Sequence, residues 1–502
     1  STKLNAPVWK FKVDVGGTFT DYIASSGEGE CSTGKVLSSG CLRSNASVLS
    51  NHTFIDASMK AYKEDFFQGF KVRLYINDEQ IDSTVEKYKA GVFEITDSIP
   101  VCQEFKYEIF TGEEAPGLVA RLETGTGLRD NFPQIELNLG TTRGTNALLE
   151  RKGARVGLIC NRGFKDLWEI GNQTRNDLFE LNIKKSDSLV HSIFEISGRL
   201  DKDGRELESL IESELVAAKE TFQQAGVESV AICLINSYVN PEHEEEVYSK
   251  IKDKFPYISV SNKVTRTIKL LERGDTTLVD AYLSPIIKDY IESIKASLPN
   301  AKIRLMTSAG GLVSPQNFSG KDSLLSGPAG GVNGFSYAAE SAGFKNAIGF
   351  DIGGTSTDVK RYGGAFEYHF ESVKAGVRVV TPMFAIETVA AGGGSICTYD
   401  GQRFLVGPES AGASPGPACY GAGGPLTVTD INLFNGKIDA EAFPFKLDRE
   451  IVKAKLEQIA CEVKHSSGKE MSTFEVADGF TRIADFKMAE AIKEISSAKG
   501  YS

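Results

Sequence analysis

Histidine is scarce in this chain of 502 residues. There are five, and none lies in an HExxH motif or close to another; they are His52, His191, His243, His369 and His465. Histidine-rich zinc sites and Ser-His-Asp triads both need histidine at a defined place. The sequence therefore disfavours a histidine-rich metal site and a hydrolase of the triad type.

The eight cysteines are scattered, and no two of them form a CxxC pair. This excludes a zinc knuckle and a thioredoxin-like redox motif. Disulfide frameworks are typical of small secreted domains, whereas scattered thiols suit a reducing compartment. We therefore predict a cytoplasmic protein.

Long apolar runs and an excess of positive charge are also missing. No stretch approaches the roughly 20 apolar residues of a membrane-spanning helix, and no charged-then-apolar leader opens the chain. The net charge is −11, which argues against nucleic acid, because phosphate backbones are bound by clustered lysine and arginine. We predict neither a membrane nor a nucleic-acid partner. The composition, 41% hydrophobic and 25% charged, is that of a globular chain with two or three domains.

What the sequence does contain is one octapeptide twice. DVGGTFTD at 14–21 and DIGGTSTD at 351–358 agree in six of eight letters. Each follows a strand-like run, WKFKVDV or NAIGFDI, and each precedes another, DYIA or DVKRY. The pattern predicts a strand, a tight Gly-Gly turn and a return strand in both places.

Asp-x-Gly-Gly-Thr after a strand suits a bound phosphate. Paired glycines allow a sharp turn that brings N–H groups against oxygen atoms, and threonine hydroxyls add donors. Mg²⁺ prefers carboxylate and water oxygens, so we predict that Asp14 and Asp351 are catalytic and hold Mg²⁺, while Asp21 and Asp358 brace their hairpins. Two such hairpins on facing domains would clamp a triphosphate from both sides. The predicted phosphate contacts are Gly16, Gly17, Thr18, Thr20, Gly353, Gly354, Thr355 and Thr357.

Three further stretches are candidates for the same site. Gly392, Gly393 and Gly394 precede a predicted hairpin, and we predict that their N–H groups reach the γ-phosphate or the substrate. GPAGG at 327–331 is either a close-packed helix start or a ligand contact. The stretch 141–145, with Thr141, Thr142, Arg143 and Thr145, lies where a strand gives way to a helix N-terminus, which attracts anions; a plain N-cap at Thr142 or Thr145 is the alternative.

Two other sequence patterns give little evidence of function. GASPG at 412–416 fits the G-x-S-x-G elbow of serine hydrolases, but the residue after Ser414 is Pro415. Proline has no N–H to complete the oxyanion hole, so we reject this function. Arg175 and Asp177 are interpreted as a surface salt bridge.

Alternating strand-like and helical segments predict an α/β fold. The segment 43–105 is strand-rich and is predicted to be an insertion. From residue 136, a strand, a helix ending at Gly153 and a second strand predict a βαβ unit, and a long helix is expected over 275–297. We predict one domain over 1–205, with the first octapeptide, and a second over 206–502, with the second octapeptide.

The paired octapeptides resemble the phosphate-1 and phosphate-2 motifs of the actin/Hsp70/sugar-kinase ATPase superfamily. More specifically, the chain resembles the hydantoinase A/5-oxoprolinase family. Besides the octapeptides, the matching stretches are GTTRGTNALLERKG at 140–153, GFKDLWEIGNQTRNDLF at 163–179, LSGPAGGVNG at 325–334, ETVAAGGGS at 387–395 and VGPESAGASPGPACYGAGGPLTVTD at 406–430.

This resemblance implies a two-domain, actin-like (ribonuclease H-like) ATPase core that uses ATP and Mg²⁺. It also implies ATP-dependent opening of a cyclic amide such as 5-oxoproline or a hydantoin, with a hydantoinase B-type subunit or fused domain as partner, in an oligomer. The 43–105 segment makes the chain longer than the family pattern there. Family members continue into a Gly-rich block that supports the adenosine, so the second domain is expected to be incomplete at its C-terminal end.

Three other functions stay open. The ATP-using subunit of an acetone or acetophenone carboxylase has the same motifs. A small-molecule kinase of the superfamily would release a stable phosphorylated product. A non-catalytic scaffold would associate with partners in a nucleotide-dependent way without turnover.

Overall fold

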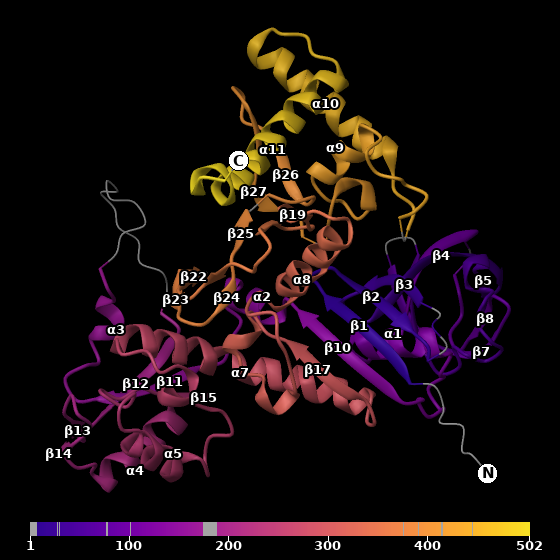
Figure 1. Cartoon of the computed structure of the whole chain (residues 1–502). Helices are drawn as coiled ribbons and strands as arrows, with labels where there is room; N and C mark the ends of the chain where they lie inside the picture. The colour runs from indigo at the N-terminus through magenta and orange to yellow at the C-terminus, as the bar shows by residue number, and fades with distance from the viewer. Residues whose placement is uncertain are drawn as a thin grey trace.

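The computed structural model (Figure 1) describes residues 8–501, apart from 28, 30, 77, 78, 101, 174–187, 375, 390, 413, 414 and 444. The fold is mixed α/β, as predicted. All eight cysteines are free thiols, while a cytoplasmic location stays a prediction. Within the described residues, no helix has both the length and the apolar character needed to cross a membrane.

The largest sheet has twelve strands in the order β18-β17-β10-β1-β2-β3-β4-β5-β8-β7-β6-β9. Their bounds are β1 Trp9–Val15, β2 Phe19–Ser25, β3 Cys31–Leu37, β4 Cys41–Ser50, β5 Thr53–Ile55, β6 Lys71–Ile76, β7 Glu79–Lys89, β8 Val92–Ile95, β9 Glu104–Phe110, β10 Ile135–Thr141, β17 Lys302–Met306 and β18 Leu312–Val313. β10 runs parallel to both β1 and β17, whereas β2 returns antiparallel to β1.

The strands β4 to β9 close on themselves. The order β4-β5-β8-β7-β6-β9 returns to β4 through a direct β4–β9 pairing, and every step is antiparallel. Closure leaves no free sheet edge. The predicted strand-rich segment 43–105 is therefore a small barrel, and its strands run slightly beyond both predicted ends, from Cys41 to Phe110.

Aromatic side chains fill this barrel. The ring of Phe93 lies 4.9 Å from that of Phe54 and 5.3 Å from that of Phe67, measured between centroids. Such pairs add to the stabilisation that burial alone gives. The barrel thus has a core of its own, and the described residues of β3 and β4 pair at Leu37 and Cys41.

A four-stranded parallel sheet forms the lower left part of Figure 1, in the order β12-β11-β15-β16. Its strands are β11 Val156–Asn161, β12 Val190–Ile196, β15 Ser229–Ile232 and β16 Ile258–Val260. The accompanying elements are α3 Leu167–Ile170, the hairpin of β13 Arg199–Leu200 and β14 Glu206–Glu208, α4 Glu212–Gln224, α5 Glu242–Ile251 and α6 Ser261–Val264. The sheet takes strands from both sides of residue 205, and the predicted division there stays a prediction.

The βαβ unit predicted from residue 136 was wrong, because its two strands do not lie in the same sheet. β10, α2 (Arg143–Leu149) and β11 follow one another as expected, but β10 belongs to the twelve-stranded sheet and β11 to the four-stranded one. The helix also ends four residues before Gly153. A Cβ at Gly153 would lie 2.0 Å from the ring of Tyr282, so this glycine makes room for an aromatic side chain rather than ending a helix.

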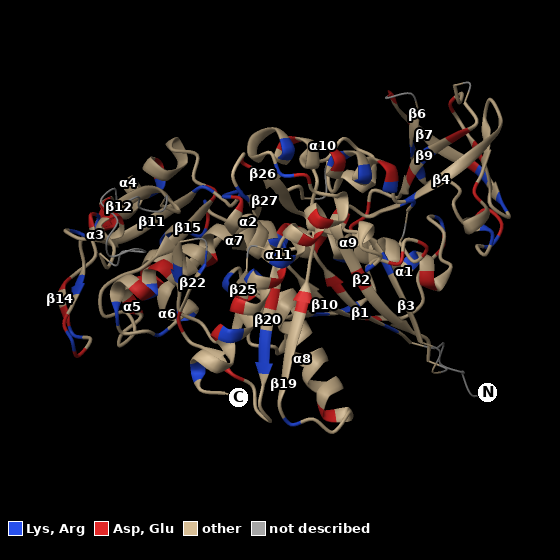
Figure 2. Cartoon of the chain, turned by 90° about the horizontal axis from the view of Figure 1, so that it is seen from above, with Lys and Arg blue, Asp and Glu red and all other residues tan. Residues whose placement is uncertain are grey.

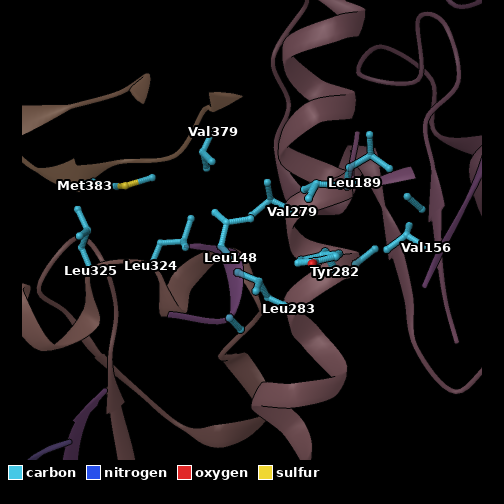
Figure 3. Packing of buried hydrophobic residues seen from close by; sticks show 14 of the residues in the cluster. Leu148, Val156, Leu189, Val279, Tyr282, Leu283, Leu324, Leu325, Val379 and Met383 are labelled. Carbon is cyan, nitrogen blue, oxygen red and sulfur yellow. The ribbon is translucent and has the colours of Figure 1, made fainter. Parts of the chain in front are cut away.

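The helix predicted over 275–297 is α7, Leu270–Ser297, which begins five residues earlier. It packs against both large sheets, and its buried residues include polar ones, such as Arg273 and Asp280, as well as apolar ones. Figure 3 shows Val279, Tyr282 and Leu283 of α7 between Leu148 of α2 and Val156 of β11, all in one cluster. α7 therefore contributes to the core beside each sheet, with Val279 and Tyr282 in the cluster of β11 and Ile287 in the cluster of β1 and β10.

The C-terminal half begins with α8, Ser326–Ser341, and a three-stranded sheet in the order β19-β20-β25. Its other elements are β19 Ala347–Ile352, β20 Thr357–Tyr362, β21 Tyr368–His369, β22 Ser372–Lys374, β23 Val377–Val379, β24 Met383–Phe384, β25 Ile386–Val389, β26 Ser395–Tyr399, β27 Phe404–Ser410, α9 Val428–Phe434, α10 Arg449–Ser467 and α11 Thr473–Ile495. In the N-terminal half, α1 Ala115–Thr124 packs on the first sheet. The predicted hairpin after the three glycines is β26–β27. A two-domain, actin-like arrangement stays a prediction.

Candidate active site

The two octapeptides fold into equivalent hairpins, as predicted. Asp14 of β1 pairs with Asp21 of β2, and Asp351 of β19 pairs with Asp358 of β20. The turns are also alike: the Gly16 N–H donates to the Phe19 carbonyl at 3.0 Å, and that of Gly353 to the Ser356 carbonyl at 2.9 Å. A repeated sequence has produced a repeated backbone.

The hairpin turns lie close together in space. A Cβ at Gly354 would be 3.8 Å from the Thr18 hydroxyl oxygen, an ordinary contact distance. In Figure 2, β19 and β20 lie side by side, with α8 between them and the strands β1 and β10. Residues 336 positions apart are thus brought close together.

Asp14 is exposed to solvent but is flanked by other carboxylates. Its pKa is raised from 3.8 to about 6, chiefly by partial desolvation and then by the charges of Asp21 and Asp351. The ammonium of Lys360 acts in the opposite direction. A cation near Asp14 therefore favours the ionised form of its carboxylate and lowers its pKa.

Small residues crowd against Asp14. A Cβ at Gly327, in the first turn of α8, would lie 2.7 Å from Asp14 Oδ1, and one at Gly140 of β10 would lie 3.4 Å away. A Cβ at Gly331, one turn further along α8, would meet Lys360 Nζ at 2.4 Å. GPAGG is thus a close-packed helix start, and its glycines bring α8 against one charge from each hairpin.

The second aspartate of each octapeptide, Asp21 or Asp358, makes contacts that suit its predicted bracing role. Asp21 is ion-paired with Lys35 at 2.9 Å, across β2 and β3. Asp358 accepts a hydrogen bond of 2.8 Å from Thr388 of β25. Burial nevertheless raises the pKa of Asp358 above its usual range.

Thr20 and Thr357 occupy the same place in the two hairpins, and both are fully buried. The Thr20 hydroxyl is 3.0 Å from the Ser38 hydroxyl, and the Thr357 hydroxyl donates to the Ala391 carbonyl. These hydroxyls hold the hairpins to neighbouring loops. Thr18 and Thr355 are partly or fully exposed, so they are the threonines available to a ligand.

The three glycines at 392–394 lie directly behind the second turn. The N–H of Gly393 donates to the Gly353 carbonyl at 2.9 Å, that of Gly394 to the Gly354 carbonyl at 2.5 Å, and that of Gly392 to the Ser395 hydroxyl at 2.9 Å. All three N–H groups are therefore engaged within the protein. This geometry supports the turn, and a direct contact with a phosphate stays a prediction.

The stretch 141–145 also serves contacts between elements. The Thr142 hydroxyl donates to the Val15 carbonyl at 3.2 Å, and Thr145 accepts from the Leu325 N–H at 3.0 Å. Thr142 is the N-cap of α2, but its side chain makes no capping bond. Arg143 is paired with Glu114 at 3.1 Å and lies over the ring of Tyr290. These residues hold β1, α2 and α8 together beside the first turn.

Lys360 is the main residue that the sequence analysis missed. It lies two residues after the second octapeptide, is 2% exposed, and affects the pKa values of Asp14 and Asp358. Its position in DVKRY, on the same face of the strand as Asp358, was the available signal. Ser414, Arg175 and Asp177 lie outside the described residues.

The residues present fit a magnesium ion in a limited way. No group of three or more His, Cys, Asp or Glu side chains is placed to hold a metal within the part of the chain that the structure describes. Mg²⁺ is commonly held by one or two carboxylates together with waters and substrate phosphates. Asp14 and Asp351, both exposed at the facing hairpins, meet that requirement.

The raised pKa of Asp14 predicts how one substitution changes stability with pH. The folded protein holds a proton on Asp14 between pH 3.8 and about 6 that the unfolded chain releases, so this group lowers stability as pH rises through that window. Asp14→Asn is therefore expected to raise the melting temperature at pH 7.5 and to leave it unchanged near pH 4. Thermal unfolding across pH tests this.

A control for that experiment is Asp478→Asn, which breaks an exposed pair with Arg482 and is expected to bring no gain at pH 7.5. Equal melting temperatures of Asp14→Asn and the parent at every pH would contradict the prediction.

Two models of one family match the chain. The model "Hydantoinase/oxoprolinase" matches residues 273–502, and "Hydantoinase/oxoprolinase N-terminal region" matches 110–255. The chain belongs to the hydantoinase/oxoprolinase family. The second hairpin lies inside the matched residues, and the first hairpin and most of the barrel precede them.

The chain is 40% identical over 409 residues to the 5-oxoprolinase of Saccharomyces cerevisiae, covering 73% of this chain and 32% of that protein. For 5-oxoprolinase 1 of Arabidopsis thaliana the identity is 37%, with the same coverage. It is 34% for the caprolactamase subunit alpha of Pseudomonas jessenii, covering 72% of this chain and 54% of that one. The chain thus spans about a third of the length of these 5-oxoprolinases.

Two solved structures resemble the fold. The ATP-dependent caprolactamase from Pseudomonas jessenii superimposes with a TM-score of 0.64 at 28% identity, over 98% of this chain and 64% of that one. Nucleotide-free acetone carboxylase gives 0.70 at 22% identity, over 99% and 64%. The second likeness concerns the fold alone.

Proposed function

We propose that this family member uses ATP to open a cyclic amide of the 5-oxoproline or hydantoin type. The observation that carries the proposal is the pair of equivalent Asp-x-Gly-Gly-Thr hairpins, which face each other across the Thr18–Gly354 approach. The family relatives named 5-oxoprolinase and caprolactamase give the substrate class.

The proposed reaction depends more on the positioning of phosphate than on acid–base side chains. An amide carbonyl is a poor electrophile. Transfer of the γ-phosphoryl group from ATP to the amide oxygen yields ADP and a phospho-imidate. One water adds to its carbon and the ring C–N bond breaks, which leaves an amine and an acyl phosphate. A second water then hydrolyses the acyl phosphate to the acid and free phosphate. Phosphoryl transfer depends mainly on alignment and charge neutralisation, which the scarcity of histidine does not hinder.

Each hairpin has a defined part in this proposal. The turn residues that would surround the phosphate are Gly16, Gly17, Thr18, Gly353, Gly354 and Thr355. The N–H groups of Gly16 and Gly353 donate within their own turns, so the proposed donors to phosphate are the N–H groups of Gly17 and Gly354 and the hydroxyls of Thr18 and Thr355. Asp14 and Asp351 would hold Mg²⁺, which neutralises phosphate charge when bound. Lys360, close to both hairpins, adds a positive charge.

The approach of Thr18 to Gly354 has a consequence for binding. A phosphate placed directly between the turns requires them to move apart, because a Cβ at Gly354 would already touch the Thr18 hydroxyl. We therefore propose that the hairpins separate to admit ATP and close on it, a hinge motion common in nucleotide-binding proteins.

A B-type subunit or domain is proposed as the partner for the hydrolytic step. The name of the caprolactamase relative, subunit alpha, denotes a protein with more than one kind of subunit. ATP-dependent ketone carboxylation is the second candidate function, because acetone carboxylase has the same fold.

The deciding experiment compares substrates. The protein, supplied with a B-type subunit, MgATP and either 5-oxoproline, hydantoin, or acetone with bicarbonate, is assayed for ADP and for the carbon product. Ring-opened acid formed with ADP supports the proposal. Acetoacetate favours the carboxylase, a stable phosphorylated product indicates a kinase, and nucleotide-dependent association without turnover indicates a scaffold.

A further inference from the structure

Lys360 is a buried lysine whose ammonium group has no close partner. The residue lies on β20, two positions after Asp358, and is 2% exposed. Within the part of the chain that the structure describes, its ammonium makes neither a hydrogen bond nor an ion pair. A buried charge without a partner is costly. The charge of Lys360 must therefore be offset by groups that lie beyond contact distance.

The side chain of Lys360 extends from the second hairpin toward the first, along α8. A Cβ at Gly331 would lie 2.4 Å from Lys360 Nζ, and a Cβ at Gly327 would lie 2.7 Å from Asp14 Oδ1. Positions four apart on a helix lie on the same face, about one turn or 5–6 Å from each other. The ammonium of Lys360 and the carboxylate of Asp14 are therefore neighbours along one face of α8.

The charges around Asp14 come from both hairpins. Asp21, Asp351 and Asp358 raise the pKa of Asp14, and Lys360 lowers it. Lys360 also acts to lower the pKa of Asp358. Asp21 already has a cation of its own, because it is paired with Lys35 at 2.9 Å. Lys360 is thus a tethered cation that acts on carboxylates of both hairpins without touching them.

We propose that Lys360 keeps divalent metal ions out of the nucleotide-free site, so that Mg²⁺ enters only together with the phosphates of a nucleotide. This inference rests on the proposed function, which makes the space between the hairpins the nucleotide site. An ammonium close to the carboxylates repels a second cation, and a buried setting strengthens that repulsion. Nucleotide phosphates bring the negative charge that compensates both cations, and they are usual ligands of Mg²⁺ themselves.

A lysine that served only to bind a phosphate would behave differently. Its removal would weaken nucleotide binding and would leave metal binding without nucleotide unchanged. The two roles are therefore separated by measuring the metal alone.

The test titrates the 502-residue protein with Mn²⁺ at pH 8 without nucleotide, and free Mn²⁺ is followed by electron paramagnetic resonance. The parent is expected to bind with a Kd weaker than about 100 μM. Lys360→Met keeps an unbranched apolar side chain and removes the charge, and it is expected to bind Mn²⁺ at least about tenfold more tightly. The control is Lys10→Met, at an exposed position on β1, which is expected to bind like the parent.

Two further measurements locate the effect. Adding Asp351→Asn to Lys360→Met is expected to remove the gain. MgCl₂ without nucleotide is expected to raise the melting temperature of Lys360→Met and not that of the parent; circular dichroism confirms the fold, and Lys360→Gln is the second neutral variant if methionine is not tolerated.

Three results would overturn the inference. They are a parent Kd tighter than about 100 μM, a folded neutral variant that binds Mn²⁺ like the parent, and a gain that survives Asp351→Asn. None of these measurements uses ATP or a cyclic amide. Failure of ring opening in the substrate assay would therefore count against the proposed function and not against the exclusion of metal by Lys360.

Discussion

Replacing Asp351 by asparagine is expected to lower ATP turnover by at least about a hundredfold, since removing one group that stabilises transition-state charge commonly costs that much. The change keeps the size and shape of the side chain. It removes the negative charge beside Asp14 that would hold the metal. Phosphate release by the complete protein with MgATP measures the effect, and circular dichroism confirms the fold.

Asp21→Asn is the matched control. Asp21 lies opposite Asp14 in the first hairpin and is ion-paired with Lys35 on the surface, where such pairs contribute little. We expect its turnover to stay within about threefold of the parent. If Asp351→Asn also stayed within that range, Asp351 would have no part in the reaction.

Gly392→Ala is expected to have the second large effect. Its Cβ would lie 2.8 Å from both the Gly353 carbonyl oxygen and the Ser356 nitrogen. These are backbone atoms of the second turn, so the clash cannot be relieved by rotating a side chain. We expect a loss of about 1–3 kcal/mol of stability, as for other overpacked sites, and at least a tenfold loss of ATP affinity, equivalent to about 1.4 kcal/mol. Calorimetric titration with MgATP and urea unfolding measure the two.

Gly334→Ala serves as the control for that experiment. A Cβ at Gly334 would meet nothing within 4 Å, and the residue is inside α8. Alanine in an open helix position is expected to raise stability by about 0.5–1 kcal/mol and to leave ATP affinity unchanged. If Gly392→Ala behaved like Gly334→Ala, the three glycines would not support the turn.

The hairpins could be predicted from sequence because their signals are local. Alternating apolar residues up to Asp14 and Asp351, followed by paired glycines, determine strand and turn within a few residues. The long helix α7 and the strands of 43–105 were predicted for the same reason. Closure of those strands into a barrel, and the parting of β10 from β11, depend on pairings between distant segments that no local pattern encodes.

The residues of the candidate site also fall into those that local sequence predicts and those whose role depends on distant contacts. That Asp14 and Asp351 face each other was suggested by the repetition of the motif. The burial of Thr20 and Thr357 was not, because a threonine next to a glycine turn reads equally well as a ligand donor or as a hydrogen bond to a neighbouring loop. Lys360 was missed because its significance lies in Gly331 of α8, which is distant in sequence and meets its ammonium group.

The attachment of the barrel bears on how freely the nucleotide site can open. The barrel is joined to the first sheet by the Leu37–Cys41 pair and by Leu118 of α1, which packs in the barrel's core. It also contacts the C-terminal half, where Lys106 donates to the Tyr420 carbonyl at 3.2 Å and Arg43 lies 5.7 Å from the ring of Phe445. On the proposed mechanism, these contacts act as a latch across the opening hairpins. The hydrogen bond is exposed and the two side chains of the cation–π contact are partly buried. Each contact is worth about 1 kcal/mol, so together they favour the closed form while leaving it easy to release. The barrel would then set the rate at which ATP enters and ADP leaves without contacting either.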